Sequence, residues 1–362
     1  MNGNAEIISL PAVDWGDGDV RDITLLELTT QEGVTGLGSA YAGADRVREA
    51  LALYRCDPEA LHTSDTALTI AMSAIDIALW DIRGKEEGRP VSELLGGRKR
   101  DRVLAYVTVD LPMTEAKAGD AFEQILRSVV DQGFRAVKLC IEAFGHRDSS
   151  LSDEEWDRRE ARLLAFARNI VGNDIQLMLD VYGSDPNWTP GLDWAVKTAK
   201  VLEAQDFLWF EEPLSPRAFD EFAQLTKTSD IAIAGAEHFV LSKDFEKVAN
   251  LQALDIMQPD CTRVGGLTQM QNIRTAATEN NLHVIPHGWN TAIGLAADLH
   301  FQATVNDDRY GMVEFWSHRT ITDLLKDKPF ALDDEGKIAV PTGAGLGVEL
   351  DDPFDSGIKL ME

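Results

Sequence analysis

Three acidic residues of this chain, Asp180, Glu211 and Glu237, each follow a short apolar segment. They are spaced 31 residues apart (180 to 211) and 26 apart (211 to 237), and either distance matches one strand followed by one helix. Neighbouring strands of a parallel sheet lie ~4.8 Å apart, so the three carboxylates would converge at one sheet edge. Converging buried negative charges need a cation, and oxygen ligands favour Mg²⁺ or Mn²⁺. We predict a divalent-metal site here; the alternative is that each acid only caps the following helix.

A histidine and an acid occupy the same kind of position farther along the chain. Asp260 and His287 each follow a proline, Pro259 and Pro286, and are 27 residues apart (260 to 287), again one strand and one helix. A carboxylate on a neighbouring strand can accept a hydrogen bond from one imidazole nitrogen and make the other more basic. We predict that His287 is a general base oriented by Asp260; the alternative is a structural histidine.

Three further side chains would face the same site. Lys138 lies within the apolar segment Ala136–Ile141, where a buried ammonium needs an anion, and the three carboxylates provide one. Cys140 is two residues farther and points the same way in a strand; we expect a packing residue, with a thiolate base as the alternative. Glu314 ends the segment Met312–Glu314, where in protonated form it would donate a hydrogen bond to a substrate oxygen that gains charge. The alternative for Glu314 is a solvated charge at the rim.

Strand and helix patterns alternate through most of the chain. Short apolar segments typical of strands occur at 103–109, 136–141, 175–181, 207–210, 231–234, 254–257, 282–285 and 312–315. Helical patterns occupy the intervals, at 116–132, 153–170, 193–204, 217–227, 242–250, 266–279 and 294–304. Eight strands with helical crossovers predict a TIM-type barrel, and acids directly after the strands fit the active-site face of such a barrel. An open, doubly wound sheet is the competing interpretation.

The segments before and after the predicted barrel differ from it. Residues 22–30 and 34–39 alternate in the manner of two strands joined by a turn. Beyond residue 65, apolar residues recur with helical spacing at Leu68, Met72, Ile75, Leu79 and Ile82. We predict an N-terminal α+β capping domain over residues 1–102, a catalytic barrel over 103–320, and a C-terminal segment over 321–362 that returns to the cap.

Composition limits the partners of this chain. Its 362 residues include 61 acidic and 34 basic side chains, which give a formal net charge of −27. Such a field repels nucleic acid and anionic lipid, so we expect neither as a partner. No apolar run approaches the ~20 residues of a membrane span, and the first ten residues lack the basic and apolar regions of a signal peptide. Solubility and a saline habitat explain the acidity equally well.

The three cysteines, Cys56, Cys140 and Cys261, are scattered and show no CxxC spacing. This distribution favours reduced thiols in a cytoplasmic protein over a disulfide framework. We also expect a homo-oligomer.

Together these residues resemble the enolase superfamily, and within it the group of mandelate racemase and the acid-sugar dehydratases. The resemblance covers nearly the whole chain. Its motifs follow the order and spacing of the family: Ser73 to Asp81, Pro90 to Gly97, Glu211-Glu212-Pro213, Gln258-Pro259-Asp260, Gly265-Gly266 and Pro286-His287.

The resemblance implies a modified (β/α)₇β barrel, capped by an N-terminal α+β domain that the C-terminal tail completes. It implies Mg²⁺ on the three carboxylates, a general-base dyad of Asp260 and His287, and an enediolate intermediate. Two positions depart from the family's pattern. Racemases of this group have the motif Lys-x-Lys where this chain has Lys138 and Cys140. The family also frequently has Asp-x-Asn where this chain has Asp180 and Tyr182, so that Tyr182 takes the position of the Asn. A second base on the opposite face is therefore not expected.

We predict an acid-sugar dehydratase, a carbon–oxygen lyase that removes the C2 proton of an aldonate or aldarate and eliminates the 3-hydroxyl. One alternative is a cycloisomerase acting on a sugar-acid lactone or an anhydro sugar acid; others are a racemase or epimerase and a non-catalytic metal-binding scaffold. The intact base dyad argues against the scaffold. Substrate contacts are expected at the barrel mouth and in the loops 14–19 and 41–45, from Tyr182, Trp15, Tyr41 and Cys140.

Overall fold

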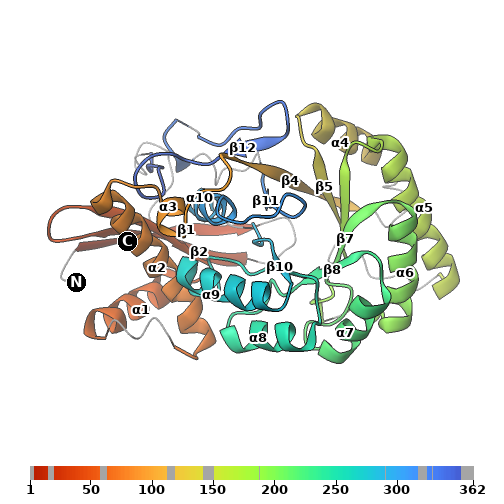
Figure 1. Ribbon diagram of the computed structural model, residues 1–362, viewed down its shortest axis with the longest axis horizontal. Coiled ribbons are helices and arrows are strands. Elements are labelled where there is room, and N and C mark those ends of the chain that lie inside the picture. Colours follow the sequence, from red (N-terminus) through yellow and green to blue (C-terminus); the bar gives the residue numbers. More distant parts are fainter. Residues whose placement is uncertain are drawn as a thin grey trace.

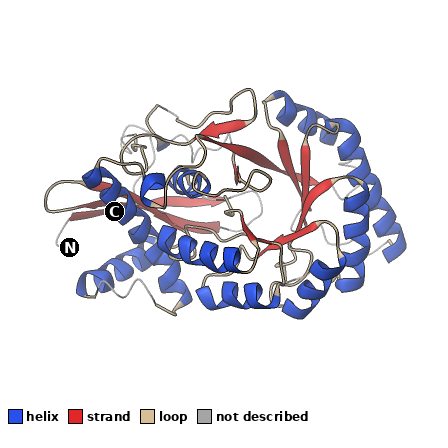
Figure 2. Ribbon diagram, in the orientation of Figure 1, coloured by secondary structure: helices blue, strands red, loops and turns tan. Residues whose placement is uncertain are grey.

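The computed structural model describes residues 4–14, 20–57, 63–111, 119–141, 151–186, 188–289, 291–316, 324–327 and 329–351. Within these residues the chain builds a three-stranded sheet and a nine-stranded sheet. The small sheet and its helices lie on one side of the molecule, and the large sheet with its surrounding helices lies on the other (Figure 1, Figure 2). No helix in the described ranges is both long and apolar enough to cross a membrane.

The small antiparallel sheet consists of β1 (Asn4–Asp14), β2 (Val20–Thr29) and β3 (Thr35–Ala40), in this order. The helices α1 (Ala44–Cys56) and α2 (Thr66–Glu87) pack against it, and we call these five elements the cap. Gly38 is required where α2 crosses β3, because a Cβ there would lie 1.8 Å from the carbonyl oxygen of Ala74. The two predicted strands and the long helix are confirmed, whereas β1 was not predicted.

Eight parallel strands wall the barrel in the part of the chain that the structure describes. They are β4 (Arg102–Leu111), β5 (Ala136–Ile141), β6 (Gln176–Asp180), β7 (Phe207–Glu211), β8 (Ala232–Gly235), β9 (Ile256–Met257), β10 (His283–Val284) and β11 (Met312–Glu314). The helices between them are α4 (Asp120–Asp131), α5 (Asp153–Val171), α6 (Leu192–Ala204), α7 (Phe219–Thr228), α8 (Ser242–Leu251), α9 (Gly266–Glu279) and α10 (Ala292–Gln302).

The strand order decides between the two predicted architectures. Neighbours in the sheet follow the chain from β4 to β10, and β11 pairs with the other side of β4. A doubly wound sheet reverses its order at a switch point, whereas this sheet shows no reversal. The prediction of a modified TIM-type barrel with seven helices between eight strands is therefore confirmed.

Large side chains fill the interior of the barrel below the carboxyl ends of the strands. The inner cluster includes Tyr106, Met178, Trp209, Ile256 and Met312. The rings of Tyr106 and Trp209 meet edge to face with centroids 5.6 Å apart, a favourable aromatic geometry. Met178 and Trp209 each stand two residues before an acid of the predicted metal site, so this packed layer forms its floor.

The cap docks on the barrel through α2 and α9. Asp76 of α2 accepts hydrogen bonds from the backbone N–H of Thr268 at 3.0 Å and from its hydroxyl at 2.5 Å. The hydroxyl of Ser73 accepts a hydrogen bond from the N–H of Gly265 at 2.9 Å. These polar residues belong to the motif from Ser73 to Asp81, whose function in the fold is therefore to fix the cap beside the loop that precedes α9.

The C-terminal segment contacts both the barrel and the cap. Its strand β12 (Lys337–Ala339) pairs antiparallel with β4. The fully buried Asp81 of α2 accepts hydrogen bonds from the N–H of Leu346 at 2.7 Å and from that of Leu37 at 2.8 Å. The predicted domain boundaries, after residues 102 and 320, stay a prediction.

A buried histidine joins the same parts. His300 of α10 accepts a hydrogen bond at Nδ1 from the N–H of Ser92 (3.2 Å) and donates one from Nε2 to the carbonyl of Leu346 (3.0 Å). Ser92 lies in the short helix α3 (Val91–Leu94) that follows the cap. Burial lowers the pKa of His300 from 6.5 to about 4, so the ring is neutral in the folded chain at neutral pH.

We predict that this histidine makes the fold sensitive to acid. Below about pH 6.5 the unfolded chain binds a proton at His300 that the folded chain does not bind until about pH 4. The free energy of unfolding therefore decreases as the pH is lowered from about 6.5 to about 4. His300 alone accounts for about 3 kcal/mol of this decrease. Urea unfolding of the wild type and of His300→Gln between about pH 7 and about pH 4.5 measures the effect. The curve of the variant should be flatter, and identical pH slopes would contradict the prediction.

Candidate active site

The three predicted metal ligands lie at the carboxyl ends of adjacent strands. Asp180 ends β6 and Glu211 ends β7, and the two are partners in the parallel ladder. Glu237 lies two residues beyond the end of β8. All three residues are at most 2% exposed, and they offer oxygen atoms within 4.8 Å of one another. The structure thus brings together the acids that regular spacing places on neighbouring strands. We call them the carboxylate cluster.

Lys138 of β5 points into this cluster. Its Nζ lies 2.6 Å from Glu211 Oε1 and 3.2 Å from Asp180 Oδ2. One ammonium does not balance three buried carboxylates, because burial and the charge of Glu211 still raise the pKa of Asp180 well above its usual value. A buried set of oxygen donors with too little positive charge fits a divalent cation, which Asp180, Glu211 and Glu237 would hold together.

The second oxygen of Glu211 is held by two neutral donors. The indole Nε1 of Trp209 and the amide Nε2 of Gln258 each donate a hydrogen bond to Glu211 Oε2 at 2.8 Å. With Lys138 on the first oxygen, the carboxylate is fixed in orientation. Such fixation favours metal binding, because the ligand loses little freedom when the ion arrives.

His287 and Asp260 form the predicted pair. His287 Nδ1 lies 2.9 Å from Asp260 Oδ2, and the other oxygen of Asp260 accepts hydrogen bonds from the N–H and hydroxyl of Thr262 at 2.7 and 2.6 Å. Burial alone would raise the pKa of Asp260, but the hydrogen bond from His287 and the charge of Arg263 outweigh it and lower the pKa. The carboxylate is therefore ionised and accepts a hydrogen bond from Nδ1, and Nε2 faces the cluster, 3.4 Å from Glu237 Oε2.

Glu314 lies inside the barrel and not at a solvated rim. Its side chain is 2% exposed. The hydroxyl of Thr108 donates to Glu314 Oε1, and the N–H of Gly288 donates to Oε2 at 3.3 Å. A Cβ at position 288 would lie 2.5 Å from the Cβ of Glu314, so glycine is required beside it. The alternative of a solvated charge for Glu314 is therefore wrong.

Cys140 is a buried packing residue beside the cluster. It is the ladder partner of Asp180, and its thiol donates to the carbonyl of Ile141 at 3.6 Å. Burial and the charge of Asp180 raise the pKa of the Cys140 thiol well above its usual value. Both observations weigh against a thiolate base at this position.

Of the predicted substrate contacts Tyr182, Tyr41 and Trp15, the structure describes the first two. Tyr182 follows β6, has a positive φ of 54°, and its ring meets the ring of His238 edge to face at 6.1 Å. Tyr41 is partly buried, with the guanidinium of Arg263 4.2 Å from its ring centroid. Trp15 lies outside the described residues.

Two residues near the cluster were not predicted. Glu212 and His238 directly follow the predicted ligands Glu211 and Glu237, and that adjacency was the available signal. His238 Nε2 lies 3.0 Å from Glu237 Oε1 and 3.7 Å from Glu212 Oε2. Glu212, Glu237 and His238 form a second set of atoms able to hold a cation.

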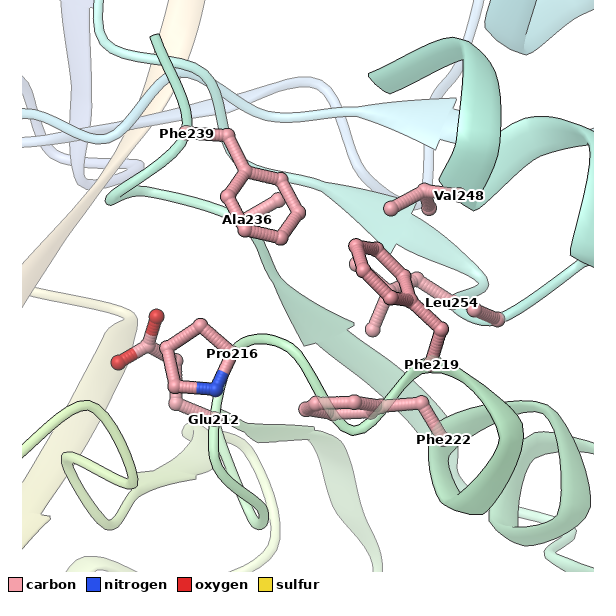
Figure 3. Close-up of a pocket in the computed structure, with 9 residues that line it drawn as sticks. Glu212, Pro216, Phe219, Phe222, Ala236, Phe239, Val248 and Leu254 are labelled. Carbon is pink, nitrogen blue, oxygen red and sulfur yellow. The ribbon is translucent and has the colours of Figure 1, made fainter. Parts of the chain in front are cut away.

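Glu212 stands between the site and an apolar pocket. The pocket is lined by Glu212, Pro216, Phe219, Phe222, Ala236, Phe239, Val248, Ala253 and Leu254. Figure 3 shows the carboxylate of Glu212 turned away from the rings of Phe219 and Phe222. Burial and the charge of Glu237 raise the pKa of Glu212 well above its usual value.

Two family models match this chain. Residues 18–96 match the model described as mandelate racemase / muconate lactonizing enzyme, N-terminal domain, and residues 120–354 match the enolase C-terminal domain-like model. The second match alone covers more than half of the chain. This chain belongs to the enolase superfamily. Enzymes of the superfamily use a divalent metal, and the carboxylate cluster is able to hold one.

Similar proteins within the superfamily are named either as cycloisomerases or as dehydratases. The chain is 31% identical to D-galactarolactone cycloisomerase of Agrobacterium fabrum over 289 residues, which are 77% of this chain and 71% of the relative. It is 29% identical to arabinonate dehydratase of Saccharolobus solfataricus over 355 residues, 91% of this chain and 89% of the relative. The crystal structure of 3,6-anhydro-D-galactonate cycloisomerase from Zobellia galactanivorans matches with a TM-score of 0.80 and 26% identity, over 99% of either chain.

We predict that the cluster binds one divalent cation and that the ion stabilises the fold. Mn²⁺ titrated calorimetrically should bind the wild type with one site per chain and raise the melting temperature. Asp180→Asn should weaken binding at least ~10-fold, while the melting temperature of the metal-free variant does not fall, because one repulsive charge is removed. Glu335→Gln, at an exposed pair with Lys337, is the matched control. Unchanged binding in Asp180→Asn would contradict the assignment.

Proposed function

We propose that this enzyme is a Mg²⁺-dependent acid-sugar dehydratase acting on an aldonate or aldarate. The observation that carries the proposal is a single base, His287 held by Asp260, facing a carboxylate cluster with a buried thiol at the usual second-base position. The relatives named as dehydratases of sugar acids support it. A non-catalytic scaffold would need neither His287 nor its ionised partner.

Proton removal from C2 is the step that the side chains must assist. A Mg²⁺ on the carboxylate cluster supplies positive charge to the substrate carboxylate, which makes the neighbouring C–H bond more acidic. In the proposal His287 Nε2 takes the C2 proton. Lys138 adds positive charge on one side, and Glu314, fixed by Thr108 and Gly288, in its protonated form donates a hydrogen bond to the substrate oxygen that gains charge.

The departing hydroxyl needs a proton in the second step. His287, now protonated, donates this proton to the 3-hydroxyl, which leaves C3 as water while the electron pair from C2 forms the double bond. The resulting enol becomes a 2-keto acid by proton transfer. One residue performs both proton transfers, which suits a site without a second lysine.

A cycloisomerase is the second candidate, because two similar proteins carry that name. The same base would remove the C2 proton, but a ring oxygen that stays attached to the molecule would leave C3. The two reactions differ in mass balance. Dehydration removes one water from the substrate, whereas cycloisomerisation leaves the mass unchanged.

A screen of acid sugars with Mg²⁺ tests the proposed function. Mass spectrometry should show loss of one water and a new 2-keto acid for at least one aldonate or aldarate, and no conversion with His287→Asn. Conversion of lactones or anhydro acids at constant mass would instead support the cycloisomerase. Epimerisation at C2 as the only reaction would contradict both candidates.

The cellular location, the partners and the oligomeric state of the enzyme are also proposals. Reduced thiols and the strong negative charge support a location in the cytoplasm with small acid sugars, and not nucleic acid or membrane, as partners. We further propose a homo-oligomer.

We predict that His287→Asn keeps the fold and metal binding but lowers kcat by at least ~10³-fold. General-base catalysis contributes ~10²–10⁴ in rate, and Lys138, the lysine in the cluster, is already held by Glu211 and Asp180. His287 is not one of the three predicted metal ligands, so calorimetric Mn²⁺ affinity serves as the check of the fold. Near-native kcat in the variant would place the base elsewhere, with Tyr182 or Lys138 examined first.

We predict that exchange at C2 is confined to one face. In D₂O, deuterium should enter only the C–H bond within reach of His287, and the opposite C2 epimer should stay inert. Cys140→Ala should reduce kcat by less than ~3-fold, since only a small buried group is lost. Exchange into both epimers, together with a loss of several orders of magnitude in Cys140→Ala, would show that Cys140 is a second base.

A further inference from the structure

The guanidinium of Arg263 lies where the cap, the carboxylate cluster and the base dyad meet. Its Nε lies 3.5 Å from Asp260 Oδ2. Its Nη1 donates a hydrogen bond to the backbone carbonyl of Glu237 at 3.4 Å. Its side chain is 8% exposed, so the charge is enclosed by protein on nearly every side.

Arg263 and His287 share one oxygen of Asp260. Oδ1 is already engaged by the N–H and hydroxyl of Thr262, and Oδ2 faces both the imidazole Nδ1 and the guanidinium Nε. Any movement of Arg263 therefore changes the charge and space around the oxygen that orients the imidazole. A buried positive charge this close restrains the carboxylate by electrostatic attraction, which a neutral neighbour would not supply.

The cap confines Arg263 from the other side. The centre of its guanidinium lies 4.2 Å from the ring centroid of Tyr41, a cation–π distance. A backbone hydrogen bond joins the same two segments, since the N–H of Tyr41 donates to the carbonyl of Thr262 at 3.1 Å. Tyr41 follows β3 of the cap, so an aromatic ring from one part of the molecule covers a charge in the other.

We propose that Tyr41 and Arg263 are a positioning pair: the ring of Tyr41 holds Arg263 against Asp260, and Asp260 thereby holds His287 in its reactive orientation. The packing of the cap on the barrel would then also set the orientation of the His287 imidazole. This role differs from the sugar contact expected for Tyr41, and as a statement about catalysis it rests on the proposed function.

Four variants separate positioning from substrate contact. Arg263→Met and Tyr41→Leu should lower kcat about tenfold or more with KM changed by less than about twofold, because the base is misaligned while substrate binding is kept. Arg263→Lys keeps a charge and Tyr41→Phe keeps a ring face, so each should recover most of the loss. Arg83→Met removes another cation that lies over an aromatic ring of the cap, 5.6 Å from Trp80, and should leave kcat unchanged.

The double variant tests whether the two residues act through one path. If Tyr41 acts only by holding Arg263, the loss in Tyr41→Leu/Arg263→Met should equal that of Arg263→Met alone. Additive losses would overturn the proposal. A rise in KM with unchanged kcat in Tyr41→Leu would also overturn it, because Tyr41 would then contact the substrate.

A measurement without turnover completes the test. In ¹⁵N-histidine-labelled protein loaded with Mg²⁺, the His287 resonance, assigned among seven histidines from the spectrum of His287→Asn, should show one tautomer with the proton on Nδ1. Tyr41→Leu and Arg263→Met should shift or broaden it, and Arg83→Met should not. An unchanged resonance in both variants would overturn the proposal. The spectrum does not depend on turnover. A failed acid-sugar screen would therefore contradict the proposed function without contradicting the positioning pair.

Discussion

Repulsion among buried carboxylates is the constraint on which this structure depends. Asp180, Glu211 and Glu237 offer oxygens within 4.8 Å of one another in an interior that is almost closed to water. Like charges at such a distance repel by roughly 3 kcal/mol for each pair at an effective dielectric constant of about 20. Side chains on flexible loops would move apart. Here the parallel ladder from β6 to β8 fixes the backbone, and the positive φ of residues 182, 212 and 236 turns the chain sharply at the three strand ends.

The surrounding groups follow from this constraint. Lys138 lies against two of the acids, and Trp209 and Gln258 hold the remaining oxygen of Glu211. The base dyad stands across from the cluster with its own acid already ionised. A site so rich in fixed negative charge is able to hold a cation, and in the proposed function that cation would offset the charge of an anionic substrate. Asp76, Asp81 and His300 hold the cap, the barrel and the C-terminal segment together.

The sequence predicts the parts that depend on regular spacing. One strand and one helix take about thirty residues, so acids at that interval lie at neighbouring strand ends; the same rule joins Asp260 to His287. It does not predict β1, where Pro11 interrupts the strand pattern and a register shift falls between Leu10 and Val13, as occurs at a bulge. Nor does it predict the contact of Tyr41 with Arg263, because more than two hundred residues separate them and only the packing of the cap on the barrel brings them together.

Anomalous diffraction from crystals containing Mn²⁺ tests the central claim most directly. If three strand-end carboxylates are held together to bind one ion, the anomalous difference map should show a single strong peak per chain, roughly 2.1 Å from oxygens of Asp180, Glu211 and Glu237. A peak on Glu212, Glu237 and His238 instead, or no peak inside the barrel at saturating Mn²⁺, would contradict it.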